Sequence, residues 1–207
     1  MANSDKKPAL ILASRSPRRK YLLEQAGLSF SIMPSDFDEN SVEPDTPETY
    51  VKTLAENKAM NIAVRFPESW VIGADTIVLI DDTILGKPEN KDQARQMLSR
   101  LSGTTHSVYT GFTICCNEKA RVLTDVVKTK VTFKRLSFDE IEWYIRTDEP
   151  FDKAGSYAIQ GLGTFLVKSI HGSYTNVVGL PVCEVIEILI REKVVYMDSK
   201  NTKELLF

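Results

Sequence analysis

Cysteine and histidine are scarce in this chain, and their scarcity excludes several kinds of site. The 207 residues include three cysteines and two histidines. Cys115 and Cys116 are adjacent, so they would point to opposite faces of a strand, and Cys183 is distant in sequence. No set of four ligands with the spacing of a structural zinc site is present, and an odd cysteine count forms no disulfide framework. The cysteine content is typical of a protein in a reducing cytosol.

Long hydrophobic runs and an excess of one charge are also absent. The apolar run near the N-terminus is shorter than the roughly 7–15 residues that a signal peptide needs. No segment reaches the roughly 18 apolar residues of a membrane span. The net charge is -2, and no long basic stretch stands out. The sequence therefore predicts a cytoplasmic protein that binds neither a membrane nor a nucleic-acid polymer, whereas a small anionic ligand remains compatible with it.

The familiar phosphate-binding loops are missing as well. The chain has no GxxxxGK[ST] sequence and no complete GxGxxG sequence, and the Gly-Leu-Gly at 161–163 is too short to count. Any nucleotide site in this chain is therefore of neither the P-loop nor the Rossmann type.

What the chain does contain is the composition of an ordinary globular domain, with 43% apolar and 26% charged residues. Its length suits one domain. Hydrophobic periodicity and turn signals predict strands at 9–14, 30–35, 70–80, 83–88, 106–116, 121–136 and 156–170. Helices are predicted after the N-caps Ser16, Thr46, Asn90 and Ser137, and from Pro181 onward. This mixture of helices, strands and antiparallel pairs predicts an α/β fold with a mixed sheet.

The first predicted helix begins with an unusual cluster of cations. Arg18, Arg19 and Lys20 occupy its first turn, where unpaired N–H groups and the helix dipole already create a positive potential. Acidic residues usually occupy such a turn, but the first acid here is Glu24. The cations indicate either a solvated basic turn or a site for a polyanion. Arginine suits phosphate because its planar fork donates two hydrogen bonds at once.

Two further charged residues stand where apolar ones are expected. Lys58 shares a helical stripe with Val51 and Ile62, so its side chain either reaches along the surface to solvent or points into a polar cleft. Asp75 interrupts the apolar strand WVIGADTIVLI, and a buried carboxylate requires an ion-pair partner, a metal or a role in a reaction. Both residues allow a purely structural explanation and a functional one.

Acidic and basic groups elsewhere complete a pattern of phosphoryl chemistry. Asp36, Asp38 and Glu39 form an acidic loop that is either solvated or a source of the oxygen ligands that Mg²⁺ prefers. Lys87 follows the returning strand in the sequence GKP. Cations, carboxylates and a helix N-terminus together indicate phosphoryl chemistry with a divalent metal.

Six sequence blocks resemble the Maf family of nucleoside triphosphate pyrophosphatases. They are LASRSPRRKYLLEQAG, VIGADTIV, ILGKP, MLSRLSGTTHSVYTG, DKAGSYAIQG and GSYTNVVGLP, and they occur in the family's order between about residues 10 and 190. The resemblance implies a single Maf-like domain over residues 1–207, with a mixed sheet and two lobes around a central nucleotide cleft, similar to inosine-triphosphate pyrophosphatases. It also implies a cytoplasmic homodimer that hydrolyses nucleoside triphosphates at the α–β phosphoanhydride with Mg²⁺ or Mn²⁺.

The same resemblance implies roles for individual residues. The phosphate-binding positions are Ser14, Arg18, Arg19, Lys58 and Lys87. Asp75 matches the general base, and Glu39 and Asp75 match the metal-binding acids. The family often has glutamate before the Lys-Pro pair where this chain has Gly86, but the lysine and the proline remain.

The base preference implied by the resemblance is for dTTP and UTP. The blocks SYAIQG and GSYTNVVGLP are similar to the dTTP/UTP branch, in which Arg18, Thr76 and Gln160 match positions linked to specificity. A glutamine amide can pair with the N3–H and carbonyl edge of uracil or thymine, although Gln160 is also explained as a solvent-facing strand residue. Two alternatives stay open, namely 7-methyl-GTP pyrophosphatase activity of the sister branch and a non-catalytic role in septum formation and cell division.

Overall fold

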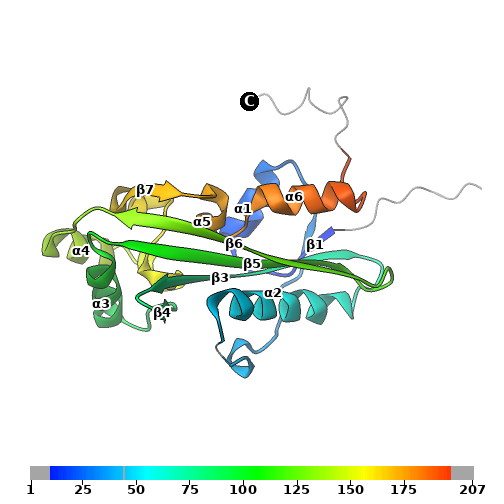
Figure 1. Ribbon diagram of the computed structural model, residues 1–207, viewed down its shortest axis with the longest axis horizontal. Helices are drawn as coiled ribbons and strands as arrows, with labels where there is room; N and C mark the ends of the chain where they lie inside the picture. The colour runs from blue at the N-terminus through cyan, green and yellow to red at the C-terminus, as the bar shows by residue number, and fades with distance from the viewer. Residues whose placement is uncertain (1–9, 44, 197–207) are drawn as a thin grey trace, which may run out of the picture.

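One seven-stranded sheet with helices on both faces forms the framework of the protein, whose computed structural model describes residues 10–43 and 45–196 (Figure 1). The strands are β1 (Leu10–Leu12), β2 (Ser31–Ile32), β3 (Trp70–Ile80), β4 (Thr83–Leu85), β5 (Thr105–Cys116), β6 (Arg121–Phe133) and β7 (Val167–His171). The α-helices are α1 (Pro17–Gln25), α2 (Pro47–Ala63), α3 (Lys91–Leu101), α4 (Phe138–Ile145), α5 (Tyr174–Val178) and α6 (Val182–Arg191). Short 3₁₀ turns lie at Glu39–Ser41, Glu149–Asp152, Ala154–Ser156 and Gly161–Leu166.

Local sequence explains where several helices begin and end. The side chains of Ser16, Thr46, Asn90 and Ser137 each accept a hydrogen bond from the backbone N–H three residues ahead. Ser137 and Glu140 also form a reciprocal capping box. Gly27 takes a φ of 72° after α1, a left-handed conformation that ends the helix at low steric cost. The predicted N-caps and the predicted end of α1 are therefore confirmed.

The sheet is mixed, as predicted. Its strand order is β2-β1-β3-β5-β6-β7, with β4 paired to β3 outside this path. β1 runs parallel to β2 and β3, whereas β3, β5, β6 and β7 form antiparallel pairs. On the edge of β3 away from β5, β1 pairs with residues 70–72 and β4 pairs with residues 78–80. Within the described residues, positions 73–77 have no strand partner on that edge, so the sheet opens there.

The two faces of the long β3–β5–β6 ribbon are covered by different helices. α2 packs on one face, whereas α1, α5 and α6 lie on the opposite face and α3 and α4 pack at one end (Figure 1). Gly73 and Gly111 allow α2 to approach closely, because a Cβ at Gly73 would lie only 2.4 Å from the Ala55 carbonyl oxygen. Cys115 and Cys116 belong to cores on opposite faces, as the alternation along a strand predicts.

One predicted strand is largely wrong. The sequence pattern predicts a strand over 156–170, but the structure has a strand only at Val167–His171. Gly155 and Gly161 take φ values of 69° and 71°, which interrupt an extended chain. The carboxylate of Glu149 accepts hydrogen bonds from two backbone N–H groups of the following segment, so this segment turns around that side chain instead of continuing a sheet.

Other departures are smaller. β2 covers only two of the residues predicted at 30–35, and α5, with five residues, is too short to leave a helical periodicity in the sequence. None of the helices within the described residues combines the length and the apolar character needed to cross a membrane.

Candidate active site

A cavity of about 980 Å³ opens beside the unpaired edge of β3. Its walls come from the start of α1, the loop after β2, α2, β3, the β4–α3 loop and the segments 152–160 and 177–179. Most of the candidate site residues named from the sequence line it, namely Ser14, Arg18, Arg19, Asp36, Glu39, Lys58, Asp75, Thr76, Lys87 and Gln160. Lys20 and Asp38 do not line it. The fold thus brings together cations and carboxylates from segments that are far apart in the sequence.

Asp75 and Thr76 line this cavity from opposite faces of the sheet. They are consecutive residues of β3, so their side chains point to opposite faces. Asp75 faces α2, and Thr76 faces α1 and the residue that follows α5. Both lie in the part of β3 that lacks a strand partner on its outer edge, and both therefore reach the cavity.

An ion-pair cluster occupies the α2 side of the cavity. Lys58 Nζ lies 2.7 Å from Asp75 Oδ1 and 2.8 Å from Glu39 Oε1. The side chains of Lys58 and Asp75 are each 11% exposed, whereas that of Glu39 is 56% exposed. Lys58 therefore points into the cavity and not along the surface to solvent. Asp75 has the ion-pair partner that its burial requires.

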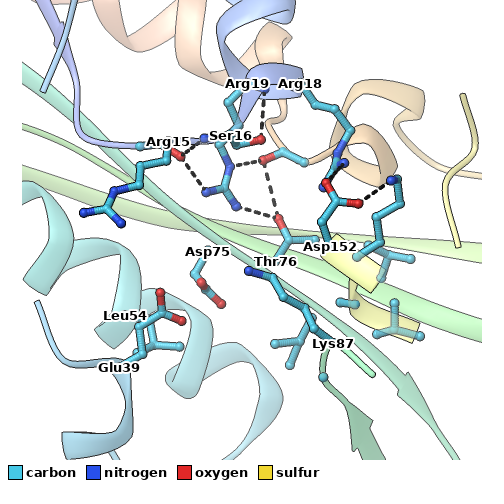
Figure 2. A pocket seen from close by; sticks show the side chains of 18 of the residues that line it. Arg15, Ser16, Arg18, Arg19, Glu39, Leu54, Asp75, Thr76, Lys87 and Asp152 are labelled. Carbon is cyan, nitrogen blue, oxygen red and sulfur yellow. Dashed lines mark hydrogen bonds and ion pairs between the residues drawn. The ribbon is translucent and has the colours of Figure 1, made fainter. Parts of the chain in front are cut away.

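Arg19 organises the opposite side of the cavity. Its Nε–H donates to the Gly179 carbonyl at 2.8 Å, and its two Nη groups donate to Ser14 Oγ at 3.2 Å and Thr76 Oγ1 at 3.1 Å (Figure 2). Burial lowers the pKa of Arg19 from its usual range, and the Asp75 carboxylate opposes this shift. The sequence predicts a phosphate-facing Arg19. The structure shows that this guanidinium also joins α1 to β3 and to the end of α5.

The first turn of α1 faces the cavity with its positive potential intact. Ser16 and Pro17 line the cavity, and the turn contains no acidic residue. Arg18 Nη1 donates a hydrogen bond to Asp152 Oδ2 at 3.1 Å. The Arg18 side chain is 27% exposed, and the Asp152 side chain is 61% exposed. Lys153 contacts the same carboxylate and donates to the Glu149 carbonyl at 2.6 Å. Asp152 thus connects Arg18 to the segment that follows α4.

Lys87 and Gln160 lie on other walls of the cavity. Lys87 is exposed, and Figure 2 shows its amino group directed toward the same space as the Asp75 carboxylate. Gln160 is half-buried and stands directly before the 3₁₀ turn Gly161–Leu166. The explanation of Gln160 as a strand residue on a solvent-facing side is therefore wrong, because this part of the chain is not a strand.

Comparison with known proteins extends over nearly the whole chain. A family model described as Maf-like protein matches residues 9–192. The chain belongs to the Maf family. A dTTP/UTP pyrophosphatase from Syntrophus aciditrophicus is 52% identical over 180 residues (87% of this chain, 88% of that protein), and one from Geotalea uraniireducens is 49% identical over 185 residues (89% and 95%). The solved structure of a HAM1 protein from Coxiella burnetii is 15% identical, with a TM-score of 0.42, over 62% of this chain and 74% of that chain.

The sequence does not predict three of the residues that line the cavity of this Maf protein, namely Tyr50, Asp152 and Lys153. Tyr50 lies two helical turns before Lys58 on the same face of α2, and this spacing is a signal that could have found it. Burial raises the pKa of Tyr50, and the nearby carboxylates add to the shift. Asp152 and Lys153 stand in the block DKAG, but their contact with α1 depends on a distant pairing that no sequence spacing reveals.

The carboxylates of Glu39 and Asp75 fit a divalent cation that is shared with a substrate. Both lie within hydrogen-bond distance of one Lys58 Nζ, so a single cation already occupies the position between them. Residues 10–43 and 45–196 contain no group of three or more His, Cys, Asp or Glu side chains that could hold a metal by themselves. Mg²⁺ is usually held by one or two carboxylates together with substrate phosphates. The donor set therefore suits Mg²⁺ or Mn²⁺ that arrives with a nucleotide.

Proposed function

We propose that this Maf protein is a nucleoside triphosphate pyrophosphatase that hydrolyses dTTP and UTP to the monophosphate and pyrophosphate. Relatives that are 52% and 49% identical over most of the chain carry the name dTTP/UTP pyrophosphatase. The observation that carries the proposal is that the α1 N-terminus, Arg18 and Lys87 converge on the same cavity as the Lys58–Asp75–Glu39 cluster. A triphosphate needs cations around its oxygens and a base near the attacked phosphorus, and this cavity offers both.

Asp75 is the proposed general base. Its carboxylate lines the cavity, where it accepts a proton from the water that attacks phosphorus at the α–β anhydride. Its ion pair with Lys58 fixes the direction of the carboxylate. A bound Mg²⁺ or Mn²⁺, held by Glu39 and Asp75, would neutralise charge on the phosphate oxygens.

Phosphate binding is the proposed task of the cations. Arg18, Lys58 and Lys87 bind the triphosphate and stabilise the charge that develops on the departing pyrophosphate. Ser14 and Arg19 support them at the start of α1, where Arg19 retains N–H groups beyond those donated to Gly179, Ser14 and Thr76. Charge positioned before the reaction, and not a covalent intermediate, supplies most of the rate.

Base selection is the proposed task of Arg18, Thr76 and Gln160. All three line the cavity, and Gln160 lies on a wall built by a different segment from the one that carries Arg18. The Gln160 amide offers a donor and an acceptor to the N3–H and carbonyl edge of uracil or thymine. The family resemblance supports two further proposals, a homodimeric state and a cytoplasmic location.

Product analysis tests the proposed function. The protein is incubated with dTTP, UTP, CTP and 7-methyl-GTP, each with Mg²⁺ or Mn²⁺, and the products are separated by ion-exchange chromatography. We expect monophosphate and pyrophosphate in equal amounts, formed fastest from dTTP and UTP. A preference for 7-methyl-GTP would place the chain in the sister branch, and release of orthophosphate would contradict cleavage at the α–β anhydride. No product from any triphosphate would favour the non-catalytic role in septum formation.

A further inference from the structure

A chain of hydrogen bonds runs from Arg19 through two threonine hydroxyls into the core. Arg19 Nη2 donates to Thr76 Oγ1 at 3.1 Å, and Thr76 Oγ1 lies 2.9 Å from Thr110 Oγ1. Thr110 Oγ1 in turn donates to the backbone carbonyl of Asn176 at 3.1 Å. Thr76 is at the cavity wall, whereas Thr110 is fully buried on the neighbouring strand β5. The chain therefore links a cavity residue to a buried residue that no ligand reaches.

The two ends of this chain decide where the hydroxyl hydrogens point. A guanidinium only donates and a carbonyl only accepts. Thr110 therefore gives its hydrogen to Asn176, and its oxygen accepts the hydrogen of Thr76. The one other acceptor near Thr76 among these contacts is the Gly179 carbonyl, at the longer distance of 3.4 Å. The nearer Thr110 oxygen therefore takes the single hydrogen of Thr76, which points into the protein and not toward a ligand.

The far end of the chain is held firmly, so this direction is a fixed property of the fold. The Asn176 side chain is fully buried and donates to the Val108 carbonyl at 3.2 Å and to Thr129 Oγ1 at 2.9 Å. Its backbone N–H also donates to Ser173 Oγ at 3.2 Å. These bonds hold the carbonyl that orients Thr110, and they explain why an asparagine is buried beside the ribbon.

We propose that Thr110 is a positioning residue that makes Thr76 a hydrogen-bond acceptor only toward the cavity, and that the site thereby favours bases with an N3–H donor over bases with an N3 acceptor. Uracil and thymine carry the donor, and cytosine carries the acceptor. The inference rests on the proposed function, in which Thr76 takes part in base selection. It assigns a specificity-determining role to a residue that touches no substrate.

The test is the ratio of kcat/KM for UTP to that for CTP in variants of position 110. In Thr110→Val, a similar volume is retained and the acceptor at 2.9 Å is lost. Only the Gly179 carbonyl at 3.4 Å then remains, so the Thr76 hydroxyl can turn its hydrogen from this long contact toward cytosine N3. We expect the ratio to fall about tenfold, mainly through faster use of CTP. Thr110→Ser keeps the hydroxyl, so its UTP-to-CTP ratio should stay near that of wild type. Thr110→Ala is the second variant that removes the acceptor, and thermal unfolding checks that each variant is folded.

Thr113→Val is the matched control. Thr113 is also fully buried on β5, and its hydroxyl lies 2.9 Å from that of Thr124, but it does not line the cavity. A ratio that stays within twofold of wild type in folded Thr110→Val and Thr110→Ala overturns the inference, as does an equal change in Thr113→Val.

Calorimetric binding of UTP and CTP without metal keeps this test separate from that of the proposed function. The ratio of the two dissociation constants should change as the kinetic ratio does, even in a protein that releases no pyrophosphate. Failure of turnover with a preserved Thr110 effect on binding would therefore refute the proposed reaction alone. Equal binding of UTP and CTP by wild type, or binding of neither, overturns the inference.

Discussion

The two sides of the cavity are built on consecutive residues of β3, yet they are held in different ways. On the α2 side, Asp75 meets Lys58, and Glu39 joins them from a short 3₁₀ turn with a 56% exposed side chain. On the other side, Thr76 is held by Arg19 and by a buried hydroxyl chain that ends in a backbone carbonyl. The first side depends on ion pairs in which another cation can replace Lys58. The second side depends on hydrogen bonds that have fixed directions, from the Arg19 guanidinium to neutral hydroxyl and carbonyl groups.

This difference separates two tasks of the proposed reaction. Ion pairs rearrange when a polyanion and a divalent cation enter, because the electrostatic attraction has no strict direction. A hydroxyl chain between a fixed donor and a fixed acceptor keeps its polarity whatever enters the cavity. We therefore expect the α2 side to govern turnover and metal affinity, and the Thr76 side to govern the choice of base. The following changes test that division.

Asp75→Asn should have the largest effect, and it should lower turnover far more than it weakens nucleotide binding. The amide keeps the size of the side chain but cannot accept the proton of the attacking water, so kcat should fall about 10²- to 10⁴-fold. Affinity for a UTP analogue with a methylene bridge between the α- and β-phosphates should change much less. Asp125→Asn makes the same change on exposed β6, away from the cavity, and should leave kcat unchanged. Near-normal turnover in Asp75→Asn would remove this residue from the role of base.

Gly73→Ala should disturb the α2 side and leave base selection intact. A Cβ at Gly73 would lie 2.4 Å from Ala55 O and 2.7 Å from Ala59 N, so α2 must move away from β3. Overpacking of this kind costs about 1–3 kcal/mol of unfolding free energy, measured by denaturant titration. Turnover should fall because Lys58 moves with α2, while the UTP-to-CTP ratio stays near that of wild type.

Gly86→Ala is the control for this variant, because a Cβ there meets nothing within 4 Å. It should leave the unfolding free energy nearly unchanged. If Gly73→Ala altered base selection as strongly as turnover, the two sides of the cavity would not be independent.

Lys58→Met should raise the affinity of the empty protein for a divalent cation. The thioether removes the ammonium that lies between Glu39 and Asp75, so both carboxylates become available to the metal. We expect the dissociation constant for Mn²⁺, measured by electron paramagnetic resonance without nucleotide, to fall about tenfold, although hydrolysis also falls. Lys87→Met removes an exposed cavity lysine and should alter Mn²⁺ binding less. Unchanged or weaker binding in Lys58→Met would mean that the metal does not share the Lys58 position.

The sequence predicts the charged side of the cavity better than the hydroxyl side, for a physical reason. A lysine on an apolar stripe and an aspartate inside an apolar strand are conspicuous, because burial of an unpaired charge is costly. Threonines in strands are ordinary, and the importance of Thr110 depends on the register that places Thr76 opposite it. The contacts of Arg19 could not be predicted from the sequence either. Its hydrogen bond to Gly179 depends on α5, which is too short to show a helical periodicity in the sequence.

Asp152→Asn should have the smallest effect, and it tests whether the Arg18–Asp152 ion pair fixes the position of Arg18 in the cavity. The Arg18–Asp152 pair is open to solvent on the Asp152 side, where the side chain is 61% exposed. Pairs that solvent reaches contribute about 0–1 kcal/mol to stability, so the unfolding free energy should hardly change. Loss of the carboxylate frees Arg18 and removes a negative charge from the path of the triphosphate, so KM for UTP should fall about threefold at low salt and converge on the wild-type value at high salt. Asp81→Asn, in the exposed pair with Arg100 outside the cavity, should leave KM unchanged. A rise in KM would show instead that Asp152 orients Arg18 for phosphate, and that fixed geometry extends to the charged rim as well.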